Sequence, residues 1–496
     1  MLFTDSCRKT KYIFHMEEKI RIVTARLNGK NMKFVMRHLA MMILIFLSIS
    51  FRMLAQVNKP NIIFILTDDH RWDALGFAGN KLIHTPEMDR LASEAAYFQN
   101  AFVTTPICAA SRASILTGMY ERSHGYTFGQ GEIKQSNIDF SYPKLLKESG
   151  YWTGFFGKFG VDYKGFNQLF DVGESYDRNG SFNDRRGYFF KKIGEDTVHL
   201  TRYTGQKAID FIRESPKEKP FMLSLSFSAP HAHDPAEKQY FWSQEFDTLY
   251  QNLVIPEPLL KEDLYFKTLP EYVQTGENRT RWYWRFDTPE KYQNSVKGYY
   301  RMISEVDAEL GKIRKALEEN EVAENTIIIL MGDNGYFLGE RQLAGKWLMY
   351  ENSLRVPLIV FDPRNPVHRN VEELALNIDI PTTIFDFAGI PTPAVSQGRS
   401  LVPVTIGENL LVDRSEFIIE HLWEVDIIAA SEGLRTTRWK YFRYRNDLEH
   451  EELYDLKNDP QEINNLVANK IYRKKLIEMR TKFDLMAKDL ESKKTQ

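Results

Sequence analysis

The chain has 496 residues, several times the length of one ordinary domain of about 150 residues, so we expect a large main domain with a smaller satellite. Its 43% hydrophobic and 27% charged residues are ordinary globular values, which excludes a disordered, collagenous or polytopic membrane protein. The formal net charge of −2 is unevenly spread: residues 1–55 contain ten Lys and Arg against three Asp and Glu, which leaves about −9 on residues 56–496. A chain of that sign is a poor partner for nucleic-acid phosphates, so we expect no nucleic-acid partner.

The N-terminal region contains an apolar run, Leu39–Phe51, of 13 residues, which is shorter than the roughly 20 residues of a membrane span. Basic residues precede it, and Met53-Leu54-Ala55 follows it, as in a secretory signal peptide. We therefore expect a signal peptide over about Met32–Ala55, export to the periplasm or the medium, and no stable membrane span after cleavage. The alternative is a short amphipathic anchor.

The first predicted strand is Asn61–Thr67, a continuous apolar run that ends at Asp68 and Asp69. Runs of this kind, rich in β-branched residues, indicate strands that are covered on both faces. A helical pattern follows over Pro86–Tyr97.

Cys108 begins the next element. Ala109–Thr117 is a helix candidate that ends at Gly118, so Cys108 lies at a helix N-terminus, where backbone N–H groups favour anions. Arg112, four residues on, lies on the same face of the helix. The other cysteine, Cys7, lies in the segment that we expect to be removed, so Cys108 is a single thiol in an exported protein. Such a thiol is either reactive or modified, or a buried inert side chain.

Further strands and helices alternate along the chain, which predicts an α/β fold with a mostly parallel sheet. Ligands bind such sheets beyond the carboxyl ends of the strands, and polar residues repeatedly follow the apolar runs, so we expect them to share one rim. The helices are predicted at Tyr142–Ser149 and Pro289–Glu319, and the strands at Pro220–Ser226, Thr326–Met331 and Val356–Phe361, which Asp362 follows.

The pattern changes beyond about residue 405. Short strands are predicted at Phe417–Glu420, Gly433–Thr436 and Trp439–Tyr444, followed by a terminal helix over Pro460–Lys488. We therefore expect three parts: a non-mature extension and signal peptide over residues 1–55, a catalytic domain over 56–405, and a C-terminal subdomain with an antiparallel sheet over 406–496.

Two predicted strands end in acidic and amide side chains, namely Asp68, Asp69, Asp333 and Asn334. This set of hard oxygen ligands suits Ca²⁺ or Mg²⁺ and lacks the His and Cys ligands that zinc prefers. Each pair taken singly is more typical of helix N-caps and turns. Together, at the ends of two strands of one sheet, they predict a metal site.

Several segments resemble the formylglycine-dependent (type I) sulfatases. Cys108-Ala109-Ala110-Ser111-Arg112 looks like the C-x-[PA]-S-R signature of that family. Five further segments resemble it in the same order: residues 61–69, 113–118, 332–335, 345–357 (GKWLMYENSLRVP) and 453–466 (LYDLKNDPQEINNL). The resemblance implies the alkaline-phosphatase-like fold, a sandwich with helices on both faces of a large sheet.

The resemblance also implies a mechanism. In the family this cysteine is oxidised to Cα-formylglycine (3-oxoalanine) by a formylglycine-generating or an anaerobic sulfatase-maturating enzyme, and the hydrate of the aldehyde attacks sulfur to give a covalent sulfo-enzyme. One Ca²⁺ per chain is implied, with Asp68, Asp69, Asp333, Asn334 and residue 108 as its ligands.

Other family residues match positions in this chain. Lys158 stands in Gly157-Lys158-Phe159-Gly160 and Lys346 in Gly345-Lys346-Trp347, and the resemblance implies that both stabilise the sulfuryl group together with Arg112. His231, after the third strand, matches the histidine that protonates the leaving oxygen. His233 is a weaker candidate for shaping the pocket.

The chain departs from the family at Gly160, where many members have a histidine that touches the hydrate. His70, His124 and Asp162 are conceivable replacements.

The substrate that we expect is a sulfated carbohydrate, with removal of O-sulfate favoured over N-sulfate. His421, Trp423 and Arg435 are candidates to reach over the pocket from the C-terminal subdomain, with interdomain packing as the alternative. Two other functions remain open: a phosphoester or phosphonate hydrolase of the same superfamily, and a non-catalytic protein that binds sulfated glycans.

Overall fold

The computed structural model describes residues 59–176, 189–234, 236–408 and 414–492. The predicted signal peptide and its cleavage site lie outside these ranges. Within them, no helix combines the length and the apolar character needed to cross a membrane.

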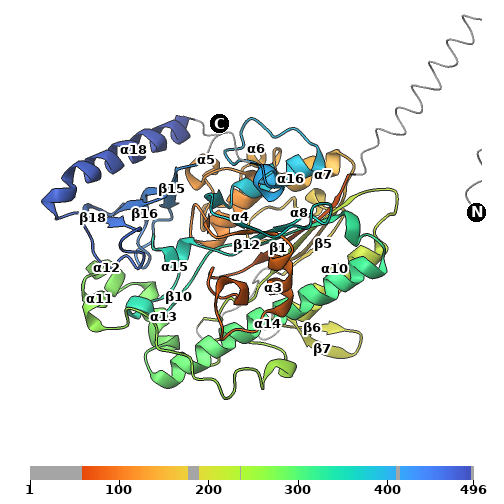
Figure 1. The fold of residues 1–496 in the computed structure, drawn as a ribbon, viewed down its shortest axis with the longest axis horizontal. Coiled ribbons are helices and arrows are strands. Elements are labelled where there is room, and N and C mark those ends of the chain that lie inside the picture. The colour runs from red at the N-terminus through yellow and green to blue at the C-terminus, as the bar shows by residue number, and fades with distance from the viewer. Residues whose placement is uncertain (1–58, 177–188, 235, 409–413, 493–496) are drawn as a thin grey trace, which may run out of the picture. The chain divides into compact units, whose positions relative to one another are not determined.

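An eight-stranded sheet forms the centre of the fold (Figure 1). Neighbouring parallel strands pair in register, so that Thr67 at the end of β1 lies opposite Gly332 at the end of β9 and Phe227 at the end of β8. In spatial order the strands are β13 (Arg369–Val371), β2 (Ala96–Phe98), β12 (Leu358–Phe361), β9 (Thr326–Gly332), β1 (Asn61–Thr67), β8 (Phe221–Phe227), β4 (Trp152–Gly157) and β5 (Val172–Ser175).

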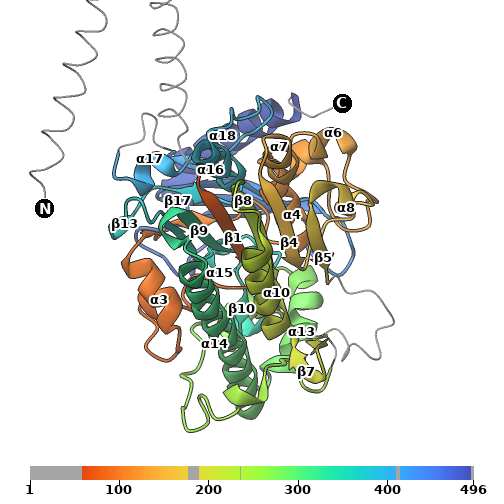
Figure 2. The ribbon, with the colours of Figure 1, turned by 90° about the vertical axis from the view of Figure 1, so that its right-hand side faces the viewer.

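Helices cover both faces of this sheet (Figures 1 and 2). Alternate residues of β1 enter two separate cores: Ile62 and Phe64 pack on one face, and Ile63 and Ile65 on the other. The first face is covered by α4 (Cys108–Thr117), α7 (Tyr142–Glu148) and α16 (Asp379–Ala388), and the second by α3 (Pro86–Ser93), α10 (Leu200–Glu214) and α14 (Pro289–Glu319). The predicted α/β sandwich with a mostly parallel sheet is confirmed.

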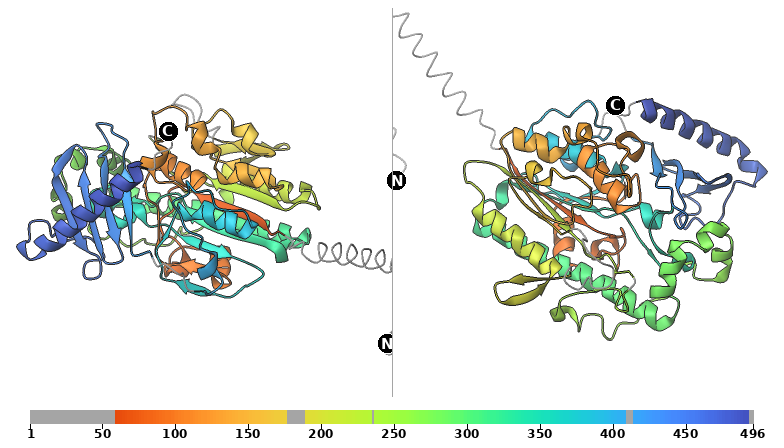
Figure 3. Two further views of the ribbon diagram at one scale, coloured as in Figure 1. Left: turned by 90° about the horizontal axis from the view of Figure 1, so that it is seen from above. Right: turned by 180° about the vertical axis from the view of Figure 1, so that it is seen from behind.

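The C-terminal residues form a separate antiparallel sheet with α18 (Arg473–Ser492) across one of its faces (Figure 3). Buried residues of α18 such as Met479 and Phe483 join the same core as the sheet residues Leu434 and Tyr441. The strands, in order, are β15 (Glu416–His421), β16 (Ser431–Thr436), β17 (Trp439–Tyr444) and β18 (Asp447–Asp455).

Three details of the sequence-based assignment are wrong. The helix predicted over Pro86–Tyr97 ends at Ser93, because Ala96–Phe98 pairs with β12 as a strand. The terminal helix starts at Arg473, because the preceding residues fold back on β18, where the backbone N–H of Leu466 donates to the Leu453 carbonyl at 2.9 Å. β12 runs antiparallel to β9, so Asp362 after it lies at the opposite rim from the other polar strand ends.

Candidate active site

The ends of β1 and β9 bring four polar side chains together. Because the two strands are parallel and in register, the residues that follow them become neighbours: the backbone N–H of Asp69 donates to Asp333 Oδ1 at 3.1 Å, and Asn334 Nδ2 donates to Asp69 Oδ1 at 2.7 Å. Asp68 follows β1 directly, and all four side chains are at most 1% exposed. The predicted cluster of strand-end oxygens therefore exists in the fold.

Three oxygens of this cluster are buried without a hydrogen bond from the described residues: Asp68 Oδ1, Asp69 Oδ2 and Asn334 Oδ1. Buried polar atoms normally have a partner, so three such atoms in one place need an explanation. A divalent cation with oxygen ligands would supply this explanation, and the donor set fits Ca²⁺ or Mg²⁺. Ligand atoms of Asp68, Asp69 and His231 also lie within 4.8 Å of one another. Asp333 is arranged differently, because its two oxygens bind the Asp69 N–H and Arg112.

Neighbouring side chains hold the other oxygen of each aspartate of the pair. Lys158 Nζ donates to Asp68 Oδ2 at 2.5 Å, and Lys346 Nζ donates to Asp69 Oδ1. Such partners fix the orientation of each carboxylate and leave its second oxygen available to bind a cation. Both lysines are nearly fully buried.

The pKa values follow these contacts. Burial alone would raise the pKa of Asp68, but Lys158, Arg112 and Lys346 together hold it well below its usual range. Burial and the neighbouring Asp68 carboxylate raise the pKa of Asp333 to about 7. Burial opposes the charged form of Lys158, yet the Asp68 carboxylate keeps its pKa above the ordinary value. Asp68 and Lys158 therefore both stay ionised within the protein.

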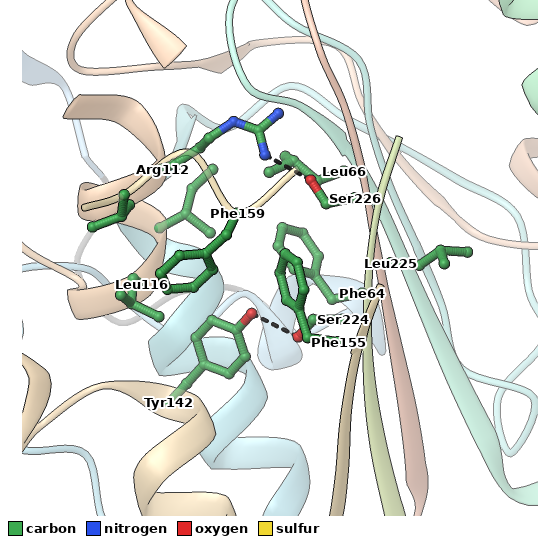
Figure 4. Close-up of a pocket in the computed structure, with 12 residues that line it drawn as sticks. Phe64, Leu66, Arg112, Leu116, Tyr142, Phe155, Phe159, Ser224, Leu225 and Ser226 are labelled. Atoms are coloured by element: carbon green, nitrogen blue, oxygen red, sulfur yellow. Dashed lines mark hydrogen bonds between the residues drawn. The ribbon is translucent and has the colours of Figure 1, made fainter. Parts of the chain in front are cut away.

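Arg112 connects the helix of Cys108 to this cluster. Its Nε donates to Asp333 Oδ2 at 2.8 Å, and its Nη1 donates to Ser226 Oγ and to the Lys158 carbonyl, both at 2.6 Å. Figure 4 shows the bond to Ser226 at one end of a small apolar cavity of about 30 Å³, with Tyr142 donating to or accepting from Ser224 at the other end. That volume is about that of one water molecule, so this cavity is not the substrate site.

Cys108 is the first residue of α4, as predicted, and is 5% exposed. It lies close enough to Lys158 and Lys346 to affect the pKa values of both. The α4 backbone begins beside the cationic side chains, which favours an anion at this point.

The larger cavity, of about 1130 Å³, opens over this centre. Cys108, Lys158, His231 and Lys346 all line it. His231 Nε2 lies 3.5 Å from Asp69 Oδ2. Several aromatic side chains also line it, together with the charged Glu277 and Arg281; the aromatic residues include Tyr126, Phe128, Tyr163, Phe166, Trp347 and Trp423. Aromatic walls above a charged floor are typical of pockets for organic ligands.

Of the predicted substrate residues, only Trp423 lines this cavity, where its ring lies 5.4 Å from that of Phe128. Arg435 instead pairs with Glu351 at 3.2 Å and lies over the Phe102 ring. His421 is fully buried in β15. His233 packs edge-on against the stacked rings of Phe189 and Phe241. The geometry of these three side chains therefore favours packing over substrate contact.

The backbone conformation of Gly160 and its contact with Arg112 bear on the absence of the family histidine at this position. Its φ is +69°, and a Cβ built on it would lie 2.6 Å from Arg112 Cδ. A side chain at this position would require Arg112 to shift from the position that it has here, so glycine suits both the backbone conformation and this placement of the arginine. Of the conceivable replacements for the missing imidazole, Asp162 lines the cavity, whereas burial lowers the pKa of His70 to about 4 and that of His124 to about 3.

Two contributors were not found from the sequence. Ser226 lies at the end of a strand that reads as apolar, and Tyr299, within α14, donates to the Asp69 carbonyl at 2.7 Å. A serine in a strand and a tyrosine in a long helix carry no local signal of such a position.

The comparisons with known proteins agree with this geometry. Residues 60–390 match the family model described as Sulfatase, and residues 339–489 match one described as N-sulphoglucosamine sulphohydrolase, C-terminal. Similar curated proteins include an N-acetylglucosamine-6-O-sulfatase of Bacteroides thetaiotaomicron (28% identical; 86% of this chain, 85% of that protein) and an arylsulfatase of Clostridium perfringens (29%; 88% and 95%). A solved structure of a protein in complex with its substrate D-glucosamine-2-N,6-O-disulfate is 26% identical, with a TM-score of 0.74 over 88% of this chain and 99% of that one. Since the Sulfatase model covers about two thirds of the chain, including every strand end that builds the acidic centre, the protein belongs to the sulfatase family.

Proposed function

We propose that this protein hydrolyses O-sulfate esters of carbohydrates, with a formylglycine made from Cys108 as its nucleophile and one Ca²⁺ at the acidic centre. The observation that carries the proposal is the set of three buried oxygens without hydrogen bonds, on Asp68, Asp69 and Asn334, beside the N-terminus of α4. When bound, the ion polarises the sulfuryl oxygens.

The charges of the centre suit a sulfate ester. Its three carboxylates face three cationic side chains, so a bound dication leaves an excess positive charge for an anionic substrate. Lys158, Lys346 and Arg112 are already fixed by their carboxylate partners, and therefore need little rearrangement as charge develops on the sulfuryl group. In this proposal His231, which lines the cavity, protonates the departing oxygen.

Conversion of Cys108 replaces the thiol carbon's C–S bond by an aldehyde C=O. This two-electron oxidation releases the sulfur and needs an external oxidant and a sulfatase-maturating enzyme. The reaction must precede complete folding, because the side chain is 5% exposed in the folded protein.

We also propose that the signal peptide over about Met32–Ala55 directs the protein out of the cytoplasm, which N-terminal sequencing of the mature protein would test.

The carbohydrate class is supported by the relatives and by the cavity. One similar protein is named an N-acetylglucosamine-6-O-sulfatase, and a similar solved structure is a complex with D-glucosamine-2-N,6-O-disulfate as substrate. Aromatic side chains such as Trp423 and Phe128 offer faces for a sugar ring.

The experiment is a comparison of sulfate release from N-acetylglucosamine 6-sulfate with phosphate release from the matching phosphate ester, using protein whose Cys108 peptide has been checked by mass spectrometry. We expect sulfate release that disappears in Cys108→Ala. Faster phosphate release would favour the phosphoester hydrolase, and glycan binding without either release, from fully converted protein, would favour the non-catalytic alternative.

A further inference from the structure

Lys346 lies in a strained turn of the backbone. The residues on either side of it, Gly345 and Trp347, have φ values of +99° and +80°. A left-handed conformation is unusual for a side chain as large as tryptophan, and it persists only where the surroundings impose it. The turn directs the Lys346 ammonium group to Asp69.

Helix α13 (Glu277–Arg285) supplies the contacts that impose this turn. The side-chain amide of Asn278 donates to the carbonyls of Ala344 and Lys346, both at 2.9 Å. Asn278 is 5% exposed, so both bonds are shielded from water. The two carbonyls lie on opposite sides of Gly345, and one amide therefore holds the turn closed.

A second contact from the same helix face fixes Trp347. Arg281, three residues after Asn278, lies 4.5 Å over the Trp347 ring and is itself held by Asp234 at 2.6 Å and Glu277 at 3.1 Å. On the other side, the backbone N–H of Trp347 donates to the backbone carbonyl of Pro106, two residues before Cys108. The turn is thus clamped between α13 and the segment that leads into α4.

We infer that Asn278 is a positioning residue for Lys346: by holding the Ala344 and Lys346 carbonyls, it keeps the ammonium group on Asp69 and facing the sulfuryl group. This inference rests on the proposed function. Asn278 itself does not line the substrate cavity, so its contribution acts through Lys346, and it affects the chemical step more than substrate binding.

The test is a double-mutant cycle that combines Asn278→Ala with Lys346→Ala, scored by sulfate release. We expect Asn278→Ala to lower kcat about 10- to 100-fold, the range typical of residues that orient a functional group, with KM changed less than threefold. In the Lys346→Ala background the same substitution should change kcat less than twofold, because the group that it positions is gone.

The control is Gln293→Ala. Gln293 also holds a loop by two backbone bonds, donating to the Ile255 carbonyl at 2.7 Å and accepting from the Ile255 N–H at 2.9 Å, but it lies outside the site. It should lower the melting temperature and leave kcat unchanged. If Asn278→Ala does not fold, Asn278→Asp, of nearly equal volume, removes the donors and replaces it in the cycle.

The inference would be overturned if Asn278→Ala lowered kcat by the same factor in the presence and in the absence of Lys346. It would also be overturned if the kcat of Asn278→Ala stayed within twofold of the wild-type value. If Cys108→Ala loses activity while Asn278→Ala keeps the wild-type kcat, the positioning role is overturned and the proposed function stands. An inactive but fully converted wild-type protein would overturn the proposed function itself.

Discussion

Gly160→Ala should disable the enzyme by displacing Arg112. The new Cβ would lie 2.6 Å from Arg112 Cδ, and ordinary contact begins near 3.4 Å, so the side chain must move by at least about 0.8 Å. A shift of this size would lengthen or bend the 2.8 Å bond from Arg112 Nε to Asp333 Oδ2, up to its complete loss. Hydrogen bonds to charged groups contribute about 1.5–3 kcal/mol each. Loss of one corresponds to a decrease in kcat/KM of about 10- to 100-fold.

The matched control is Gly194→Ala. Gly194 also has a positive φ, of +57°, but a Cβ there meets nothing within 4 Å. Both alanines carry the backbone cost of the left-handed conformation, about 1–2 kcal/mol, whereas only the one at residue 160 meets the arginine. The assay is kcat/KM for sulfate release together with thermal unfolding. Full activity of Gly160→Ala, or an equal loss of activity in Gly194→Ala, would refute this reasoning.

Three further predictions concern the metal, a buried acid and the cavity wall. Removal of divalent ions by a chelator should abolish activity and lower the melting temperature, and Ca²⁺ at 100 times its Kd should restore about 2.7 kcal/mol of stability; an unchanged melting curve would contradict a bound ion. Burial raises the pKa of Glu121 to about 8, so the unfolded chain, with a pKa near 4.5, loses its proton first and stability falls as pH rises from about 4.5 to 8. Above pH 5, Glu121→Gln should therefore have a larger free energy of unfolding than wild type, by an amount that grows up to pH 8 and stays below about 5 kcal/mol, and its melting temperature should be correspondingly higher. A constant difference across this range would argue against a buried neutral acid. Trp423→Ala should raise KM for a sulfated monosaccharide about 2- to 10-fold with little change in kcat. Arg435→Ala, which removes one of the two cationic partners of Glu351 (the other is Lys440), should lower the melting temperature and leave KM unchanged.

The sequence was informative where local pattern and tertiary position coincide. Asn61–Thr67 is a strand because its unbroken apolar run suits a position between two layers of helices, and Asp68 and Asp333 come together because parallel strands end at one rim. Lys158 and Lys346 could be proposed only through the family resemblance, since an isolated lysine carries no local signal.

Other features depend on contacts that no local pattern encodes. Ser226 and Asn278 act through partners 114 and 68 residues away in the chain. The strand over Ala96–Phe98 exists because β12 lies beside it. The sequence left open whether Arg435 reaches over the pocket or packs between the domains, and the fold supplies Glu351 as a partner for it.

A crystal structure of the mature protein grown with Ca²⁺ tests the central claim most directly. We expect a cation in contact with Asp68 Oδ1, Asp69 Oδ2 and Asn334 Oδ1, and an oxygen in place of sulfur on the side chain of residue 108. An intact thiol together with ordinary water between these oxygens, in protein that releases sulfate, would contradict the account.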